Sequence, residues 1–180
     1  MQSLKGQFLI ASPKLMDPNF ARSVVLLIQH DAKAALGVVI NRPLDVTLQQ
    51  ACEQSLGAGC EFDGVLHHGG PCEAMLVVLH TDESAAEAQV LPGVYFTTTK
   101  DRVEQLLENP GSQMKFFVGY SGWGPGQLEA EFESGSWIAV PAVADRVFGP
   151  TENLWSRLTA EAGLSKWVDP ARIPDDPSVN

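Results

Sequence analysis

The stretch from Gly119 to Glu129 constrains the fold of this chain more than any other. It reads GYSGWGPGQLE, so that four glycines fall within eight residues, beside two aromatic side chains. Glycine is costly in a packed domain unless the backbone needs a positive φ or a close approach. We therefore expect a shaped loop here, between a strand over residues 114–118 and a short helix over residues 127–133.

Other segments also combine glycine, proline and polar residues beside apolar runs. They are LIASPKL at residues 9–15, DPNFARSVVLL at 17–27, GVVINRP at 37–43 and GGP at 69–71. Together with the glycine-rich stretch, they resemble the YqgE/AlgH family of small bacterial proteins over residues 4–155. The resemblance implies strands bent into a split, partly barrel-like sheet with helices packed outside. It implies no settled biochemical activity, although some members are named as transcriptional regulators.

The order of the predicted elements indicates the fold class. Strands mostly follow strands, with helices inserted irregularly, which favours α+β over a doubly wound sheet. Strands are predicted at residues 7–11, 23–29, 36–40, 64–67, 75–79, 94–97, 114–118 and 137–140, and helices at 47–55, 98–107, 127–133 and after 150. We therefore expect an α+β fold, with a bent, split β-sheet forming a partly barrel-like core and about three to four helices packed outside.

Two connecting segments have their own predictions. Asn41-Arg42-Pro43 is expected to end the third strand, because proline cannot donate to a central ladder. Residues 81–88 are acidic and are expected to be exposed.

The length and composition predict a single domain. The chain has 180 residues, of which 44% are apolar, enough to bury a core without disulfides. We assign residues 1–168 to this domain. Residues 169–180 hold three prolines and three aspartates with few apolar side chains, so we expect a disordered C-terminal tail.

The charge distribution argues against anionic macromolecular partners. The formal net charge is −10; residues 1–45 carry five basic and three acidic side chains, and residues 46–180 carry seven basic and nineteen acidic ones. A negative field of this kind repels phosphate backbones and anionic membranes. We expect neither direct nucleic-acid binding nor membrane association.

The cysteines and the apolar runs bear on the compartment. Three cysteines without CxxC spacing favour reduced thiols over a disulfide scaffold. Uninterrupted apolar runs reach only about five residues, far below the roughly 20 that span a bilayer. The sequence therefore predicts a cytoplasmic protein.

Three parts of the sequence partly match known catalytic or ligand-binding motifs, but none of the matches is complete. A nucleophile elbow at Ser121 would need glycine where Trp123 stands. A phosphate loop at the same glycines is opposed by Glu129 and its acidic neighbours, which already occupy the positive end of the following helix. His67 and His68 should point to opposite faces of a strand, so they do not favour a shared metal ion. We predict no catalytic residue, no metal site and no cofactor.

Two arginines carry open alternatives. Asp17, Asn19 and Arg22 lie within six residues, and Arg22 either faces a cleft or pairs with Asp17 to pin the loop. Asn41 and Arg42 carry the same ambiguity.

The glycine-rich stretch has a comparable ambiguity. Tyr120 and Trp123 either wall a pocket or fill the core beneath the loop. We predict that the motif loops converge on one ligand site containing Asp17, Asn19, Arg22, Asn41, Arg42, Tyr120, Trp123 and Gln127.

The favoured function is a non-enzymatic regulatory module that binds a small polar ligand or a protein partner in a loop-lined cleft. It would act indirectly if it takes part in transcriptional regulation. The alternative is an enzyme of unknown reaction that uses Asp17, Arg22, His68 or Glu129 as polar catalysts.

Overall fold

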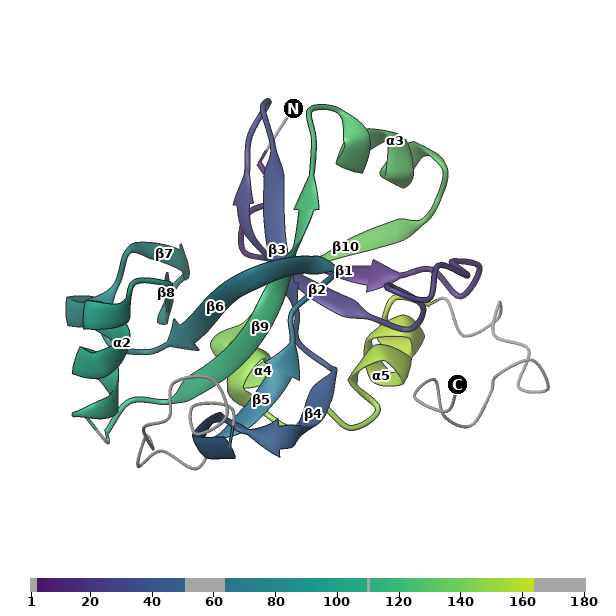
Figure 1. Cartoon of the computed structure of the whole chain (residues 1–180). Coiled ribbons are helices and arrows are strands. Elements are labelled where there is room, and N and C mark those ends of the chain that lie inside the picture. The colour runs from purple at the N-terminus through teal and green to yellow at the C-terminus, as the bar shows by residue number, and fades with distance from the viewer. Residues whose placement is uncertain (1–2, 51–63, 110, 164–180) are drawn as a thin grey trace.

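The computed structural model describes residues 3–50, 64–109 and 111–163. These residues form a strongly curled, half-barrel sheet with helices packed outside it (Figure 1). The predicted α+β class with a bent, split and partly barrel-like sheet is confirmed. The expected tail at residues 169–180 and residues 51–55 of the expected helix lie outside the described residues.

The elements follow the chain in a strand-rich order. The strands are β1 (Gln7–Ala11), β2 (Val24–His30), β3 (Ala35–Val39), β4 (Pro43–Thr47), β5 (Val65–His68), β6 (Cys72–His80), β7 (Ala88–Leu91), β8 (Val94–Thr97), β9 (Met114–Trp123) and β10 (Trp137–Pro141). The helices with full bounds are η1 (Glu83–Ala85), α2 (Lys100–Leu107), α3 (Gln127–Glu133), α4 (Ala144–Phe148) and α5 (Leu154–Glu161). The sheet order is β10-β1-β2-β3-β9-β6-β8-β7, and β5 pairs with both β4 and β9.

Strand β9 joins the two halves of the split sheet. Its first part pairs antiparallel with β6 and parallel with β5, and its last three residues pair antiparallel with β3. Gly119, with φ of 75°, lies between Val118 and Tyr120, the last two residues that pair with β6, and just before the part that pairs with β3. One long strand therefore belongs to both halves.

The expected loop from Gly119 onward is wrong in its extent. Residues 119–123 continue β9, and only residues 124–126 form the turn before α3. The physical reason is a close backbone approach. A β-carbon at Gly119 would lie 2.7 Å from the carbonyl oxygen of Gly70 and 2.8 Å from that of Cys72. Gly119 is therefore required because two chain segments cross in close contact there, and not because the chain forms a loop.

The third strand, β3, ends at Val39, before Asn41-Arg42-Pro43, as expected. Two further strands, β4 and β7, are not among the predicted ones. Pro43 begins β4, which pairs with β5, and proline is tolerated as the first residue of a strand. Residues 81–88 are not uniformly exposed, because Ala85 of η1 is fully buried and Ala88 begins β7.

The helix predicted from residue 47 does begin where expected. Thr47 and Gln50 form a reciprocal capping pair. The Thr47 backbone N–H donates to Gln50 Oε1 at 3.0 Å, and the Gln50 backbone N–H donates to Thr47 Oγ1 at 3.3 Å.

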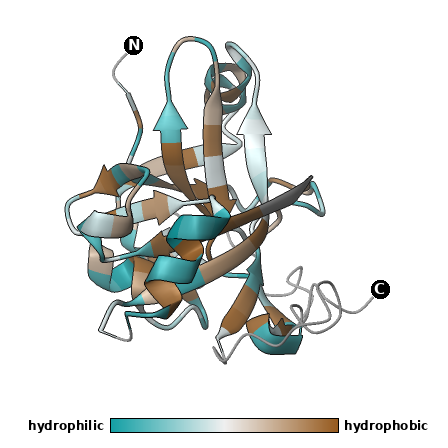
Figure 2. Cartoon of the chain, turned by 60° about the vertical axis from the view of Figure 1, so that its left-hand side comes forward, coloured by the Kyte–Doolittle hydropathy of each residue, from teal (hydrophilic) through white to brown (hydrophobic). Residues whose placement is uncertain are grey.

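The core divides between the two faces of the sheet. Phe117 of β9 belongs to the larger apolar cluster, whereas its neighbour Phe116 belongs to a smaller one beneath α2. On α5, Leu154, Trp155 and Leu158 are buried. Hydrophobic residues gather along the strands in the middle of the molecule (Figure 2). Among the described helices, none combines the length and hydropathy needed to cross a membrane.

Candidate functional site

Arg22 enters β2 through an unusual backbone conformation. Its φ is 57°, in the left-handed region that arginine rarely adopts. The side-chain amide of Asn41 holds this entry from the end of β3: Nδ2 donates to the Arg22 carbonyl oxygen at 2.9 Å, and Oδ1 accepts from the Val24 N–H at 2.8 Å. Asn41 thereby fixes the place at which the Arg22 side chain leaves the sheet.

Arg42 shapes the loop that precedes Arg22. Its Nη2 donates to the carbonyl oxygens of Pro18 at 3.2 Å and Ala21 at 3.1 Å. Burial lowers the pKa of Arg42, and the nearby carboxylate of Asp17 acts in the opposite direction. Asp17 also accepts the backbone N–H of Asn19 at 2.8 Å. These three residues order residues 17–21.

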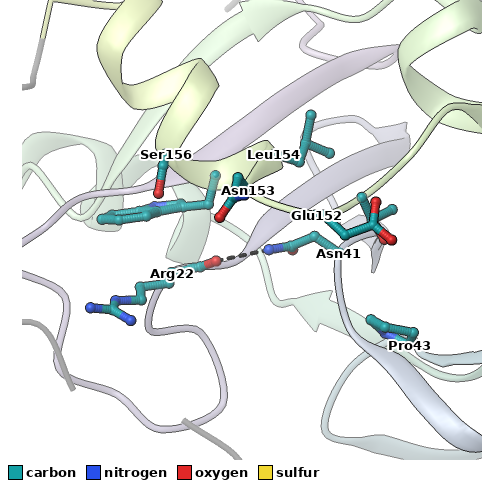
Figure 3. Close-up of a pocket in the computed structure, with 9 residues that line it drawn as sticks. Arg22, Asn41, Pro43, Glu152, Asn153, Leu154 and Ser156 are labelled. Carbon is teal, nitrogen blue, oxygen red and sulfur yellow. Dashed lines mark hydrogen bonds between the residues drawn. The ribbon is translucent and has the colours of Figure 1, made fainter. Parts of the chain in front are cut away.

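A cavity of about 260 Å³ lies where this corner of the sheet faces the start of α5. One wall contains Arg22, Asn41 and Pro43, and the other is the continuous segment 151–156 (Figure 3). The guanidinium carbon of Arg22 lies 5.8 Å from the ring centroid of Trp155, within the range of a cation–π contact. The indole of Trp155 is itself fixed, because Nε1 donates to the Ala11 carbonyl oxygen at 2.8 Å.

The opposite wall carries a second left-handed residue. Asn153 has φ of 56°, and within the described ranges Arg22 and Asn153 are the two non-glycine residues with positive φ. Both line this cavity. Asparagine adopts this conformation with little cost, whereas arginine does not. Backbone strain concentrates at ligand sites, because there the surrounding structure enforces it.

A second cavity, of about 330 Å³, lies between β10, α4 and α5. Its lining is mainly apolar, and its two charged residues, Arg146 and Glu161, form an ion pair at 2.8 Å. The first cavity contains more hydrogen-bonding side chains, so it is the better candidate for a polar ligand.

Trp123 lies in an aromatic cluster in the core. It is 3% exposed and contacts Phe20 and Trp137 at centroid distances of 6.1 Å. The indole N–H groups of Trp123 and Trp137 both donate to Oε2 of Glu131, at 2.9 and 2.7 Å. Gln127 closes the turn before α3, since its Oε1 accepts the Gly124 N–H at 3.1 Å.

The predicted site residues thus separate into three groups. Arg22 and Asn41 line the cavity, and Asp17, Asn19 and Arg42 order the loop that leads to it. The lining of this cavity does not include Tyr120, Trp123 or Gln127. Phe20 connects the two regions, because its ring contacts Trp123 and it precedes Arg22 by two residues.

The sequence analysis missed the wall formed by residues 151–156. It predicts a helix after residue 150, but no motif links the start of that helix to Arg22. The one local signal was an asparagine, Asn153, just before the helix, since asparagine favours left-handed positions.

The described residues show neither an accessible Ser121 nor a metal-binding cluster. Ser121 is fully buried and its hydroxyl donates to the Gly69 carbonyl oxygen at 3.3 Å, so it cannot reach a substrate as a nucleophile. Among the described residues, no group of three or more His, Cys, Asp or Glu side chains could hold a metal ion.

The curled sheet and its helices define a class of small mixed α/β proteins with known relatives. A family model described as AlgH-like matches residues 8–167, and the chain belongs to this family. It is 40% identical over 178 residues to a UPF0301 protein of Myxococcus xanthus, covering 96% of both chains. It is 37% identical over 182 residues to a UPF0301 protein of Chlorobaculum tepidum, covering 97% of this chain and 95% of that one.

Solved structures agree with this assignment. The solution structure of the AlgH protein of Pseudomonas aeruginosa is similar with a TM-score of 0.75 and 30% identity, over 97% of both chains. A crystal structure of a Corynebacterium diphtheriae protein gives a TM-score of 0.71 and 25% identity, over 89% of this chain and 87% of that one.

Proposed function

We propose that this protein is a non-enzymatic regulatory module that binds a small anionic ligand in the cavity between Arg22 and residues 151–156. The observation that carries the proposal is the placement of Arg22. A strained backbone, held by Asn41, puts its guanidinium against the ring of Trp155 at the edge of a cavity. An arginine that served only to keep the surface soluble would not require a left-handed backbone conformation.

The chemistry of the cavity supports a small ligand. Its volume of about 260 Å³ is near the lower end of ligand pockets. Beside Arg22, the lining offers the hydroxyl groups of Thr151 and Ser156 and the amide of Asn153, and the carboxylate of Glu152 lies at the opposite end of the site from Arg22 (Figure 3). A guanidinium with several neutral hydrogen-bonding groups suits a carboxylate, sulfate or phosphate group on a small molecule.

Binding is better supported than catalysis. Of the polar groups considered as catalysts, Arg22 lines the cavity, whereas Asp17, His68 and Glu129 are not part of its lining. Glu129 is instead bonded to Nε2 of His30 at 3.2 Å. A general acid or base must reach the substrate, and these carboxylates are placed elsewhere.

We propose that ligand binding acts through a protein partner in the cytoplasm, and not through DNA. The excess of acidic side chains in residues 46–180 supports this, because it opposes contact with a phosphate backbone.

A thermal-shift screen with small anions, including sulfate, phosphate and dicarboxylates, tests the proposed site. We expect at least one anion to raise the melting temperature of the wild type, and Arg22→Ala to abolish that rise. Arg146→Ala, which removes an arginine from the second cavity, is the matched control and should keep it. An equal response in Arg22→Ala and the wild type would contradict the proposal.

A further inference from the structure

A buried lysine lies behind one wall of the proposed site. Lys115 of β9 is only 8% exposed, and its Nζ donates to the carbonyl oxygens of Val147 at 2.9 Å and Gly149 at 3.4 Å. These carbonyls lie at the end of α4 and lead directly into residues 151–156, which form the cavity wall. The ammonium group therefore helps to position that wall from inside.

Two titratable groups face Lys115 from neighbouring elements. His67 of β5 is 5% exposed, and burial together with the Lys115 charge lowers its pKa to about 4, so it is neutral at pH 7. Glu152, which follows α4 and lines the cavity, favours the charged form of Lys115. Burial dominates, however, and lowers the pKa of Lys115 to about 8.

The formal charges of the cavity lining cancel. Arg22 and Glu152 are the two charged side chains among its lining residues, and they have opposite signs. In Figure 3 they lie at opposite ends of the site. These two charges by themselves give the lining no net preference for an anion. Two cations lie behind the wall that holds Glu152: Lys115, bonded to the carbonyls of Val147 and Gly149 and attracted to the Glu152 carboxylate, and the more exposed Arg157, whose Nη2 donates to the Pro150 carbonyl oxygen at 3.3 Å.

We infer that Lys115 determines the charge preference of this site: its ammonium offsets Glu152 and makes the cavity net positive. It does so without touching the ligand. The inference rests on the function proposed above. If Lys115 has this role, anion affinity falls when Lys115 loses its proton, because the charges of the two charged lining residues, Arg22 and Glu152, sum to zero.

Sulfate is the probe for this inference, since it keeps its full charge from pH 6 to pH 10. Its affinity is measured by calorimetric titration at pH 7.0 and pH 9.5 at constant ionic strength. We expect about three- to tenfold weaker binding at pH 9.5, because Lys115, with a pKa of about 8, has mostly lost its proton at that pH. A merely structural lysine would not produce this pH profile.

Three variants separate the charge of Lys115 from its packing. Lys115→Arg keeps a cation at both pH values, so it should bind sulfate without the fall at pH 9.5. Lys115→Met should bind weakly at both. Lys100→Met removes an exposed lysine of α2 and should behave as the wild type does. If Lys115→Met does not fold, the wild-type and Lys115→Arg profiles decide the question.

The outcomes distinguish this inference from the proposed function. Sulfate binding that depends on Arg22 but has the same affinity at both pH values overturns the role of Lys115 and leaves the site in place. Retention of the pH-dependent fall in Lys115→Arg overturns it as well. Absence of Arg22-dependent binding by sulfate and the other anions overturns the proposed function, and the inference with it.

Discussion

The backbones of Gly69 and Gly119 cross in direct contact. A β-carbon on Gly69 would lie 2.2 Å from the carbonyl oxygen of Gly119, closer than any side chain permits. Backbone hydrogen bonds hold the crossing: the Gly69 N–H donates to Val118 O, and Gly69 O accepts from the Val39 N–H, both at 2.8 Å. The crossing thus joins β9, the segment after β5 and the end of β3.

Gly69→Ala should therefore be strongly destabilising. Its β-carbon meets backbone atoms, which cannot rotate away, so strands must shift. Overpacking of this kind costs about 1–3 kcal/mol or more. Urea denaturation measures the change in the free energy of unfolding.

Gly124→Ala is the matched control from the glycine-rich stretch. The nearest atom to its β-carbon would be Gln127 Oε1 at 4.0 Å, so we expect a change within about 0.5 kcal/mol. Equal stability of the two variants would show that the crossing can relax.

The crossing also explains what the sequence could predict of the fold. Apolar runs identified most strands, and Thr47 identified a helix start, because these signals are local. The sequence predicts a loop at Gly119 and Gly122, because it does not show that another backbone lies against β9 at Gly119, or that the side chains of Tyr120 and Cys72 lie beside Gly122. Glycine marks close approach and turns alike.

In the candidate site, too, the sequence reveals local features but not long-range contacts. The sequence predicts Arg22 and Asn41 as site residues from the proline and polar residues of two separate motifs, and the hydrogen bond from Asn41 Nδ2 to the Arg22 carbonyl oxygen joins these motifs. The wall at residues 151–156 is over 100 residues away in the chain, and its role depends on how α5 packs against β1. Long-range packing of this kind leaves no local pattern.

Glu131→Ala should destabilise the aromatic cluster. One carboxylate oxygen accepts the indole N–H groups of Trp123 and Trp137, and both rings are 3% exposed. A buried donor left without an acceptor costs about 1–3 kcal/mol. Glu133→Ala, an exposed glutamate of the same helix, is the control and should be nearly neutral. Similar denaturation midpoints for the two variants would argue against the shared acceptor.

His67 should make the fold sensitive to mild acid. Burial and the charge of Lys115 lower its pKa to about 4, against about 6.5 in an unfolded chain. Between these values the unfolded state binds more protons, so stability falls as pH decreases from 6.5 to 4. The full difference is on the order of 3 kcal/mol.

The replacement His67→Phe tests this assignment. The wild type should lose stability between pH 7 and pH 4.5, and the variant should lose less, because the phenylalanine ring cannot take up a proton. Denaturant titrations at both pH values give the comparison. Parallel losses in the two proteins would assign the acid sensitivity to other groups.

Direct DNA binding is expected to be absent. The balance of −12 over residues 46–180, from seven basic and nineteen acidic side chains, opposes a phosphate backbone. Fluorescence anisotropy with duplex DNA at near-physiological salt should show no binding tighter than about 10⁻⁴–10⁻⁶ M, the non-specific range. Tighter binding would contradict the proposed indirect role.

Arg22→Gly should separate the stability of the fold from the function of the site. Glycine removes the left-handed penalty at φ of 57°, about 1–2 kcal/mol for a residue with a β-carbon. The variant also loses the contact with Trp155, about 0.5–1 kcal/mol, and gains entropy in the unfolded state, about 0.5–1 kcal/mol. These changes nearly offset one another, so the free energy of unfolding should change by less than about 1 kcal/mol.

Anion-induced stabilisation should nevertheless disappear, because the guanidinium is gone. Arg22→Lys keeps the charge and the backbone strain, and should retain part of the anion response. A variant Arg22→Gly that remained folded and still responded to anions would show that this left-handed arginine serves some purpose other than ligand binding.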